Sequence, residues 1–401
     1  MLRVRSTGAR PRRQDRTRGM TRIAFFGHDA ADAAVRRRVQ GFLDDGLEVT
    51  GFMMRRRDPG ALTWDNIDLG ETRDGAFIQR IRQVLAGARL AAAQREKLAV
   101  ADVIYARNLD MLACAFLAKR YAKLDTPVIY ESLDVHRLLT RQDPIGSAVR
   151  SLERLLLKRS AGLVVSSPGF IRNHFERRYP GQFRAFVVEN RLAPGAAYGA
   201  RACERKSDPS AERRPLRLGW VGNLRCRRSF GLLCDLADRF PDRLEIHLHG
   251  VPARTEIPVF EPMIDARPNL HFHGRYRSPE DLASIYAPLD VVWAGDFMEA
   301  GYNSVWLLPN RIYEGGYYCT PSIAPAGTET AAWLERHGCG FIIGEPLETS
   351  FPGLIATLIE DRQPIAARAA VLAALPVDTF IQPKGFLADM VQRSLDREMA
   401  A

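Results

Sequence analysis

Short runs of β-branched and aromatic residues alternate with helical stretches along almost the whole chain. In the first half we predict strands at residues 22–27, 47–54, 102–107, 127–131, 162–167 and 185–190. The alternation restarts further on, with strands predicted at residues 216–222, 244–250, 269–274, 290–295, 321–325 and 340–344. Strands that alternate with crossover helices form parallel sheets covered by helices. We therefore expect two Rossmann-like α/β domains.

Composition marks where these domains should begin and end. Residues 193–214 are rich in Ala, Gly, Pro, Ser and charge, lack apolar periodicity, and predict a linker. We expect an N-terminal domain at 20–192 and a C-terminal domain at 215–375, followed by a C-terminal helix within 376–401. A chain of 401 residues is long enough for two separate cores.

Most of the positive charge lies in an N-terminal tail. Residues 1–19 carry seven Arg and one Asp, a net +6 out of a total of +10. The tail has few large hydrophobic residues, so we expect it to be disordered. Because it also lacks interleaved aromatics, we expect no nucleic-acid partner.

The sequence contains no secretory leader and no run of about 18 apolar residues, which predicts a cytoplasmic protein.

Cysteine and histidine patterns give weaker indications. The six cysteines form no C-x-x-C pair, so we expect reduced, mostly buried thiols. Two H-x-H pairs, His247/His249 and His271/His273, fall on predicted neighbouring strands, where residues two apart share a face. A metal site is one interpretation. Half-buried strand histidines are the favoured one, because no clear carboxylate accompanies them.

Ligands of open α/β sheets bind where strands lead into helices, and one such loop opens the second half. Gly222 and Asn223 predict a tight turn there, and Arg228 or Ser229 is expected to begin the next helix. Free N–H groups at the helix start, with Arg225 and Arg228, would suit a diphosphate. The alternative is an ordinary turn with a solvated basic edge.

A later helix carries a second group of candidate residues. Pro309 fits the first helical position, so Asn310 and Arg311 should lie in the first turn. Glu314 lies four residues after Asn310 and three after Arg311, so all three side chains should share one helix face. A carboxylate there could accept hydrogen bonds from the two vicinal hydroxyls of a ribose. The alternative is a surface Arg–Glu pair, with the two following glycines serving helix–sheet packing.

In the first half, one strand end carries candidate proton-transfer residues. The predicted strand at 127–131 leads into Asp134 and His136. Histidine titrates near neutral pH and a carboxylate can orient it, so this pair could serve as general base. The alternative is that both residues cap the next helix.

Several expected motifs are absent. The chain contains no G-x-x-x-x-G-K-[ST] and no G-x-G-x-x-G after its first strand, which argues against a P-loop enzyme and a dinucleotide oxidoreductase. It also lacks a D-x-D pair that would hold a metal–diphosphate. We therefore expect arginines and helix ends to neutralise a diphosphate, without a metal and without a cofactor.

The motifs together resemble those of two-domain GT-B glycosyltransferases, in particular the succinoglycan-type exopolysaccharide group. The similar segments are "IYARNLDMLA", "YESLDVHRLL", "LGWVGNLRCRRS", "VVWAGDF" and "LLPNRIYEGGYY". The resemblance implies that Glu314 holds the donor ribose, with Asn310 and Arg311 near the nucleotide. It also implies that the diphosphate is held by Gly222, Asn223, Arg225 and Arg228, with Thr328 and Glu329 near the donor.

One departure from the family pattern concerns the donor sugar. Many retaining members carry a second glutamate eight residues before the helix glutamate, where this chain has Trp306. Asp296, Glu299 or Asn303 would then have to contact the sugar, and the stereochemical outcome cannot be carried over.

We therefore expect a metal-independent hexosyltransferase that uses a UDP-sugar, with UDP-glucose as the expected donor, and a lipid-linked oligosaccharide acceptor. Peripheral membrane contact would be needed, and the basic helix expected at 147–163 carries Leu152, Leu155 and Leu156 among its basic residues. A core-facing helix with a solvated basic side is the favoured alternative. Rival functions are a nucleotide-sugar epimerase on the same fold and an inactive subunit that binds a partner.

Overall fold

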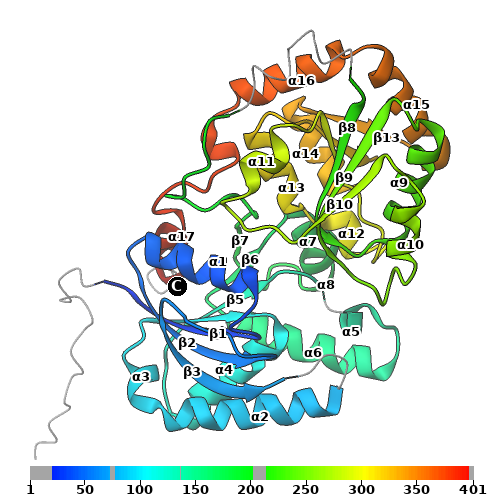
Figure 1. The fold of residues 1–401 in the computed structure, drawn as a ribbon. Helices are drawn as coiled ribbons and strands as arrows, with labels where there is room; N and C mark the ends of the chain where they lie inside the picture. The colour runs from blue at the N-terminus through cyan, green and yellow to red at the C-terminus, as the bar shows by residue number, and fades with distance from the viewer. Residues whose placement is uncertain (1–19, 73–76, 136, 202–213, 397–401) are drawn as a thin grey trace, which may run out of the picture.

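The computed structural model describes residues 20–72, 77–135, 137–201 and 214–396. These residues form two parallel sheets, each covered by helices on both faces (Figure 1). The predicted α/β fold with two sheets is confirmed. The predicted tail 1–19, His136 and residues 202–213 of the predicted linker lie outside the described residues.

The first sheet has seven strands in the order β3-β2-β1-β4-β5-β6-β7. They are β1 (Arg22–Gly27), β2 (Glu48–Arg55), β3 (Asp65–Glu71), β4 (Val103–Arg107), β5 (Val128–Ser132), β6 (Gly162–Val165) and β7 (Ala185–Val187). Its helices are α1 (Ala33–Asp44), α2 (Phe77–Ala93), α3 (Arg95–Ala99), α4 (Leu109–Tyr121), α5 (Arg137–Thr140), α6 (Pro144–Lys158), α7 (Pro168–Phe170) and α8 (Glu176–Arg178). A π-helical turn, Ile171–Phe175, joins α7 to α8.

The second sheet has six strands in the order β10-β9-β8-β11-β12-β13. They are β8 (Leu216–Leu224), β9 (Leu244–Pro252), β10 (Leu270–Gly274), β11 (Val291–Trp293), β12 (Ser322–Pro325) and β13 (Gly340–Ile343). The helices are α9 (Arg227–Arg239), α10 (Phe260–Asp265), α11 (Leu282–Tyr286), α12 (Asn303–Trp306), α13 (Asn310–Tyr317), α14 (Glu329–His337), α15 (Leu347–Glu360) and α16 (Gln363–Ala374). A 3-10 turn, Val377–Thr379, follows α16.

Alternation along the strands divides each half into two packed layers. On β1, Phe25 packs into the core formed with α1, whereas Phe26 packs into the core that contains residues of α2, α4 and α6. Successive strand side chains point to opposite faces, so an all-apolar strand must be covered on both sides. The sheets are therefore buried, and polar side chains concentrate where the strands end.

The last helix returns to the first half of the chain. Helix α17 (Phe386–Leu395) buries Leu387, Met390 and Val391 in the same core as α1. The carboxylate of Asp45 accepts hydrogen bonds from the backbone N–H groups of Gly385 and Leu387, both at 2.7 Å. Figure 1 shows the red α17 beside the blue α1. The segments that connect the two halves lie side by side, since Leu192 forms a parallel bridge with Ile381.

The predicted strands are all present, with ends that differ by a few residues. Strand β3 was not predicted, because its sequence DNIDLGE carries only two large apolar residues and lies at the edge of the sheet.

The expectation of reduced thiols is wrong at Cys319, which is disulfide-bonded. Cys114, Cys226, Cys234 and Cys339 are buried free thiols, as expected.

Candidate active site at the junction of the two halves

The two halves meet through a buried side chain on α12. Asn303 accepts a hydrogen bond from the N–H of Val135 at 2.8 Å and donates one to the carbonyl of Val135 at 3.0 Å. Both residues are buried. Asp134 precedes Val135 and has an exposed side chain, so it lies next to this contact. The structure thus brings one predicted base, Asp134, to the junction, while His136 lies outside the described residues.

Trp306 takes part in the same junction. Its backbone carbonyl accepts a hydrogen bond from the Ser167 hydroxyl at 2.5 Å, and its ring lies edge-on to Phe170 with centroids 6.4 Å apart. A Cβ added at Gly169 would come within 2.5 Å of the Trp306 carbonyl oxygen. The position at which the family pattern has a glutamate is therefore occupied here by a packing contact with the first half.

The three residues expected to replace that glutamate lie close together. Asp296 accepts hydrogen bonds from the Met298 N–H at 2.9 Å and the Ser304 hydroxyl at 3.2 Å. Asn303 donates to Glu299 as well as to Val135. Asp296, Glu299 and Asn303 thus form one polar group after β11, at the carboxyl edge of the second sheet.

The predicted turn at Gly222 and Asn223 is wrong. Strand β8 continues through both residues, with Gly222 paired to Gly250 and Asn223 to Val251 of β9. Gly222 has a φ of 116° and Gly250 one of 141°, and a Cβ at Gly250 would lie 1.7 Å from the Gly222 carbonyl oxygen. Because neither glycine has a side chain, the backbones of β8 and β9 can approach closely here and both strands continue.

The next helix also begins differently from expectation. Helix α9 starts at Arg227, and its N-cap is Cys226, whose sulfur accepts from the Ser229 N–H. Neither Arg228 nor Ser229 opens it. The two arginines expected to bind diphosphate have carboxylate partners: Arg225 lies 3.3 Å from Asp296, and Arg228 pairs with Glu345 at 2.8 Å.

Helix α13 carries Asn310, Arg311 and Glu314. It begins at Asn310, one residue later than predicted, with Pro309 as its N-cap. Arg311 and Glu314 are buried, at 8% and 3% exposure, so the alternative of a surface Arg–Glu pair is wrong. Arg311 donates to the Trp293 carbonyl at 3.3 Å. Asn310 is half-buried at the start of the helix.

Tyrosines surround the Glu314 carboxylate. The hydroxyl of Tyr286 donates to Glu314 Oε2 at 2.7 Å. Burial, reinforced by the negative charge of Glu314, raises the pKa of Tyr286 well above its ordinary value, so this phenol remains a donor. Gly316 allows close packing against the residue that follows the 3-10 turn, and not against the sheet: a Cβ at Gly316 would lie 2.4 Å from the ring of Phe380.

Thr328 and Glu329 lie at the start of α14. Thr328 is the N-cap, and its hydroxyl accepts from the Ala331 N–H at 3.0 Å. Glu329 is 6% exposed and forms an ion pair with Arg172 of the first half. The predicted donor-side residue Glu329 thus contributes a second polar contact between the halves.

The first sheet has a polar carboxyl edge of its own, of which the sequence analysis singled out only the end of the strand predicted at 127–131. Buried Glu131 accepts from Arg38 Nε at 2.9 Å and lies 3.5 Å from Arg107 Nε. His28 follows β1 and lies 3.4 Å from Asn108, and burial lowers its pKa below the ordinary value. The strand-end rule that selected the second-half loops would have found His28 and Asn108.

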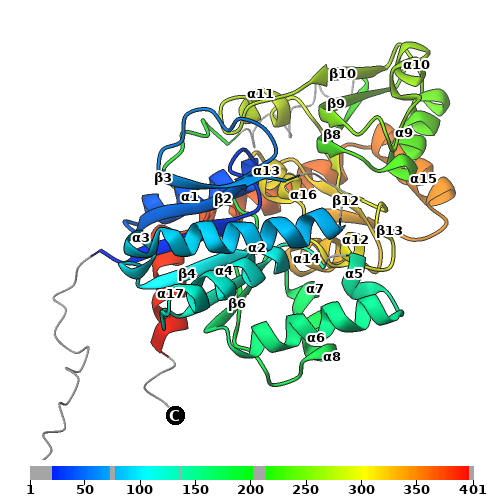
Figure 2. The ribbon, with the colours of Figure 1, turned by 90° about the horizontal axis from the view of Figure 1, so that it is seen from below.

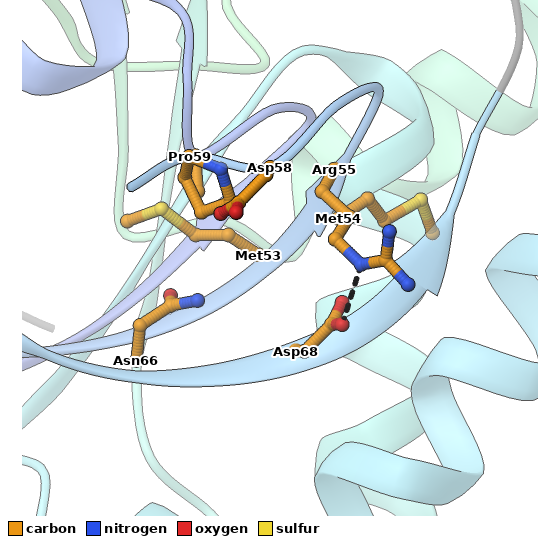
Figure 3. Close-up of a pocket in the computed structure, with 8 residues that line it drawn as sticks. Met53, Met54, Arg55, Asp58, Pro59, Asn66 and Asp68 are labelled. Carbon is orange, nitrogen blue, oxygen red and sulfur yellow. Dashed lines mark hydrogen bonds and ion pairs between the residues drawn. The ribbon is translucent and has the colours of Figure 1, made fainter. Parts of the chain in front are cut away.

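A cavity of about 370 Å³ opens at the carboxyl end of β2, beside Asn66 and Asp68 of β3. Met53 and Met54 are among its lining residues, together with polar groups (Figure 3). Arg55 and Asp68, joined by a 2.8 Å ion pair, form one side, and Asp58 lies on the loop above (Figure 3). This arrangement combines apolar surface with acceptors suited to a saccharide.

The predicted H-x-H pairs do come together. His247 Nδ1 lies 3.1 Å from His273 Nε2, and the rings of His249 and His273 stack at 4.2 Å. Across the part of the chain that the structure describes, no three His, Cys, Asp or Glu side chains are arranged to hold a metal ion. Nor does that part contain a helix long and apolar enough to span a bilayer.

Comparisons with known proteins agree with this architecture. No family model matches the chain. It is 39% identical over 329 residues to succinoglycan biosynthesis protein ExoL of Rhizobium meliloti (strain 1021), covering 81% of each chain.

Solved structures share the fold. Sucrose-phosphate synthase from Thermosynechococcus elongatus superposes with a TM-score of 0.68 at 15% identity, over 95% of this chain and all of the other. Anabaena HepE, solved in complex with UDP and glucose, gives a TM-score of 0.65 at 15% identity, over 94% of this chain and all of that one. The chain belongs to the succinoglycan-type group of GT-B glycosyltransferases.

Proposed function

We propose that the protein transfers a hexose from UDP-glucose to a lipid-linked oligosaccharide during exopolysaccharide assembly. The proposed donor site is based on Glu314, a buried carboxylate on α13, the helix between β11 and β12. A hydrogen bond to a charged group contributes about 1.5–3 kcal/mol, so one ribose hydroxyl on this carboxylate would matter for affinity. HepE, which has the same fold, was solved with UDP-glucose, and this supports the choice of donor.

Arginines would hold the diphosphate without a metal. Arg225 and Arg228 project from the loop and first turn before the body of α9, and each already pairs with a carboxylate. An incoming diphosphate would replace Asp296 and Glu345 as their partners. Guanidinium groups bind phosphate oxygens in a bidentate manner and would stabilise the charge that develops on the departing UDP.

The acceptor would approach from the first half. The cavity beside Met53 and Asp68 offers a place for a saccharide, and Asp134 lies at the junction with an exposed carboxylate. In an inverting reaction, Asp134 or His136 would take the proton from the acceptor hydroxyl. The name of ExoL supports a saccharide product within exopolysaccharide synthesis.

The test is direct product analysis. Purified protein is incubated with radiolabelled UDP-glucose and lipid acceptors extracted from membranes of a succinoglycan-producing strain. We expect the label to move into the lipid phase and to be lost from it when Glu314 is changed to Gln. Label that stays in the nucleotide sugar, or appears in an epimeric UDP-sugar without any acceptor, would contradict the proposal.

A further inference from the structure

Helix α6 presents a one-sided charge distribution. Its only acidic residue, Glu153, is fully buried, where it accepts from Tyr179 at 2.7 Å and lies 2.9 Å from His174. The outward side of the helix carries Arg150, Arg154 and Lys158. The charge of α6 that meets solvent is therefore entirely positive.

A cavity of about 380 Å³ lies between this side of α6 and α8. It is lined by Ser147, Ser151 and four arginines, Arg150, Arg154, Arg177 and Arg178, a set that we call the arginine pocket. Tyr179, whose hydroxyl is anchored on Glu153, also lines it. Figure 2 shows α6 and α8 together along the lower edge of the molecule.

The arginine pocket has no internal counter-charge. Arg154 donates to the Arg178 carbonyl at 3.2 Å and Arg150 to the Leu139 carbonyl at 3.2 Å, both neutral acceptors. Among the described residues, none of the four arginines forms an ion pair, whereas Arg80 and Arg214 elsewhere in the chain do so. Guanidinium groups and serine hydroxyls together donate hydrogen bonds to phosphate oxygens. The pocket therefore suits a phosphate group.

Exposed aliphatic side chains lie next to the pocket on the same helix. Ile145, Leu152 and Leu155 are 47%, 41% and 46% exposed, although Leu156 is buried as a core residue. Leu152 follows Ser151 of the pocket, and Leu155 follows Arg154. A helix with basic and apolar surface side by side is typical of one that rests on anionic headgroups.

We propose that the arginine pocket and the adjoining leucines bind anionic phospholipid headgroups, so that α6 lies on the membrane surface. A soluble phosphate would use the arginines alone and leave the exposed leucines without a role. Because α6 follows Asp134 closely in the first half, docking here would bring the acceptor side of the enzyme to the lipid surface. The inference adds a binding site to the proposed function but does not depend on the donor.

The test compares vesicle binding of full-length variants in cosedimentation. One variant carries Arg154→Gln, Arg177→Gln and Arg178→Gln, and a matched control carries Arg82→Gln, Arg89→Gln and Arg120→Gln, which are exposed arginines on α2 and α4. Both keep the Arg-rich residues 1–19, so any contribution from that segment is the same. Vesicles contain equal parts of phosphatidylglycerol and phosphatidylcholine, or phosphatidylcholine alone.

We expect the pocket variant to bind phosphatidylglycerol vesicles about 100-fold more weakly than wild type, from about 1 kcal/mol per basic residue near an anionic surface. The control should lose less than about threefold. A Leu152→Ser/Leu155→Ser variant should also lose affinity, about tenfold. Melting curves check that all variants fold.

Equal losses in the pocket and control variants would overturn the proposal, because they would show only a general charge effect. An unchanged leucine variant, with binding abolished by inorganic diphosphate at low salt, would instead indicate a soluble phosphate ligand and would also overturn it. These measurements use no UDP-sugar, so they remain informative if the proposed donor is wrong.

Discussion

Asn303 of the second half binds both backbone polar groups of Val135 in the first half, although 168 positions separate them in the sequence. Both residues are buried. Because Val135 lies between Asp134 and His136, this contact fixes where the proposed base stands relative to the donor side. Together with the Ser167–Trp306 and Arg172–Glu329 contacts, this amide side chain sets the geometry between the two halves.

Replacing Asn303 by Ala should cost stability and turnover together. The N–H and carbonyl of Val135 would lose their partners, and each unsatisfied buried group costs about 1–3 kcal/mol. We expect the free energy of unfolding, measured by urea denaturation, to fall by about 2–4 kcal/mol. Asn173→Ala is the control, since Asn173 is half-buried and makes a single bond to the Gly169 carbonyl. Similar losses in both variants would show that the contact has no special role.

The close approach of β8 and β9 predicts opposite outcomes for two glycine substitutions. Gly250→Ala would place a Cβ 1.7 Å from the Gly222 carbonyl oxygen at a φ of 141°, and should destabilise the protein by more than about 3 kcal/mol. Gly231→Ala, on α9 with open space around it, should stabilise by about 0.5–1 kcal/mol. Thermal unfolding of the two variants checks this, and equal midpoints would show that the strands can separate.

The histidine cluster predicts a pH dependence. Burial, reinforced by neighbouring histidines, lowers the pKa of His247 and His249 to about 4, while Glu245 opposes the shift at His247. The unfolded chain binds protons near its ordinary histidine pKa of about 6.5, so stability should fall as pH drops from about 6.5 towards 4. In His247→Gln/His249→Gln, the decrease in melting temperature from pH 7 to pH 5 should be smaller by about 3 °C. His337→Gln, which lies outside the cluster, should keep the wild-type slope.

Periodicity predicted the two sheets because most of the strands are short apolar runs that alternate with helical stretches, which gives a strong signal. Edge strand β3 has no such apolar signal, since its sequence DNIDLGE is mostly polar. Strand-end polarity predicted Asp134, because parallel strands bring their carboxyl ends to one edge of a sheet. Glu314 was predicted instead from its helical spacing to Asn310 and Arg311.

Contacts between the halves could not be predicted in this way. The pairing of Asn303 with Val135, and of Glu329 with Arg172, joins residues far apart in the sequence through tertiary packing alone. The turn expected at Gly222 failed for a similar reason. Two glycines on different strands, 222 and 250, determine together that the strands continue, and neither is informative without the other.

Calorimetric titration of the purified protein with UDP-glucose in excess EDTA tests the central claim most directly. We predict measurable binding by wild type, and an affinity about 10- to 100-fold weaker for Glu314→Gln, which removes the charge but keeps an acceptor for Tyr286. Glu335→Gln, an exposed residue of α14, should bind as wild type does. Absence of binding by wild type, or an unchanged affinity in Glu314→Gln, would contradict the account.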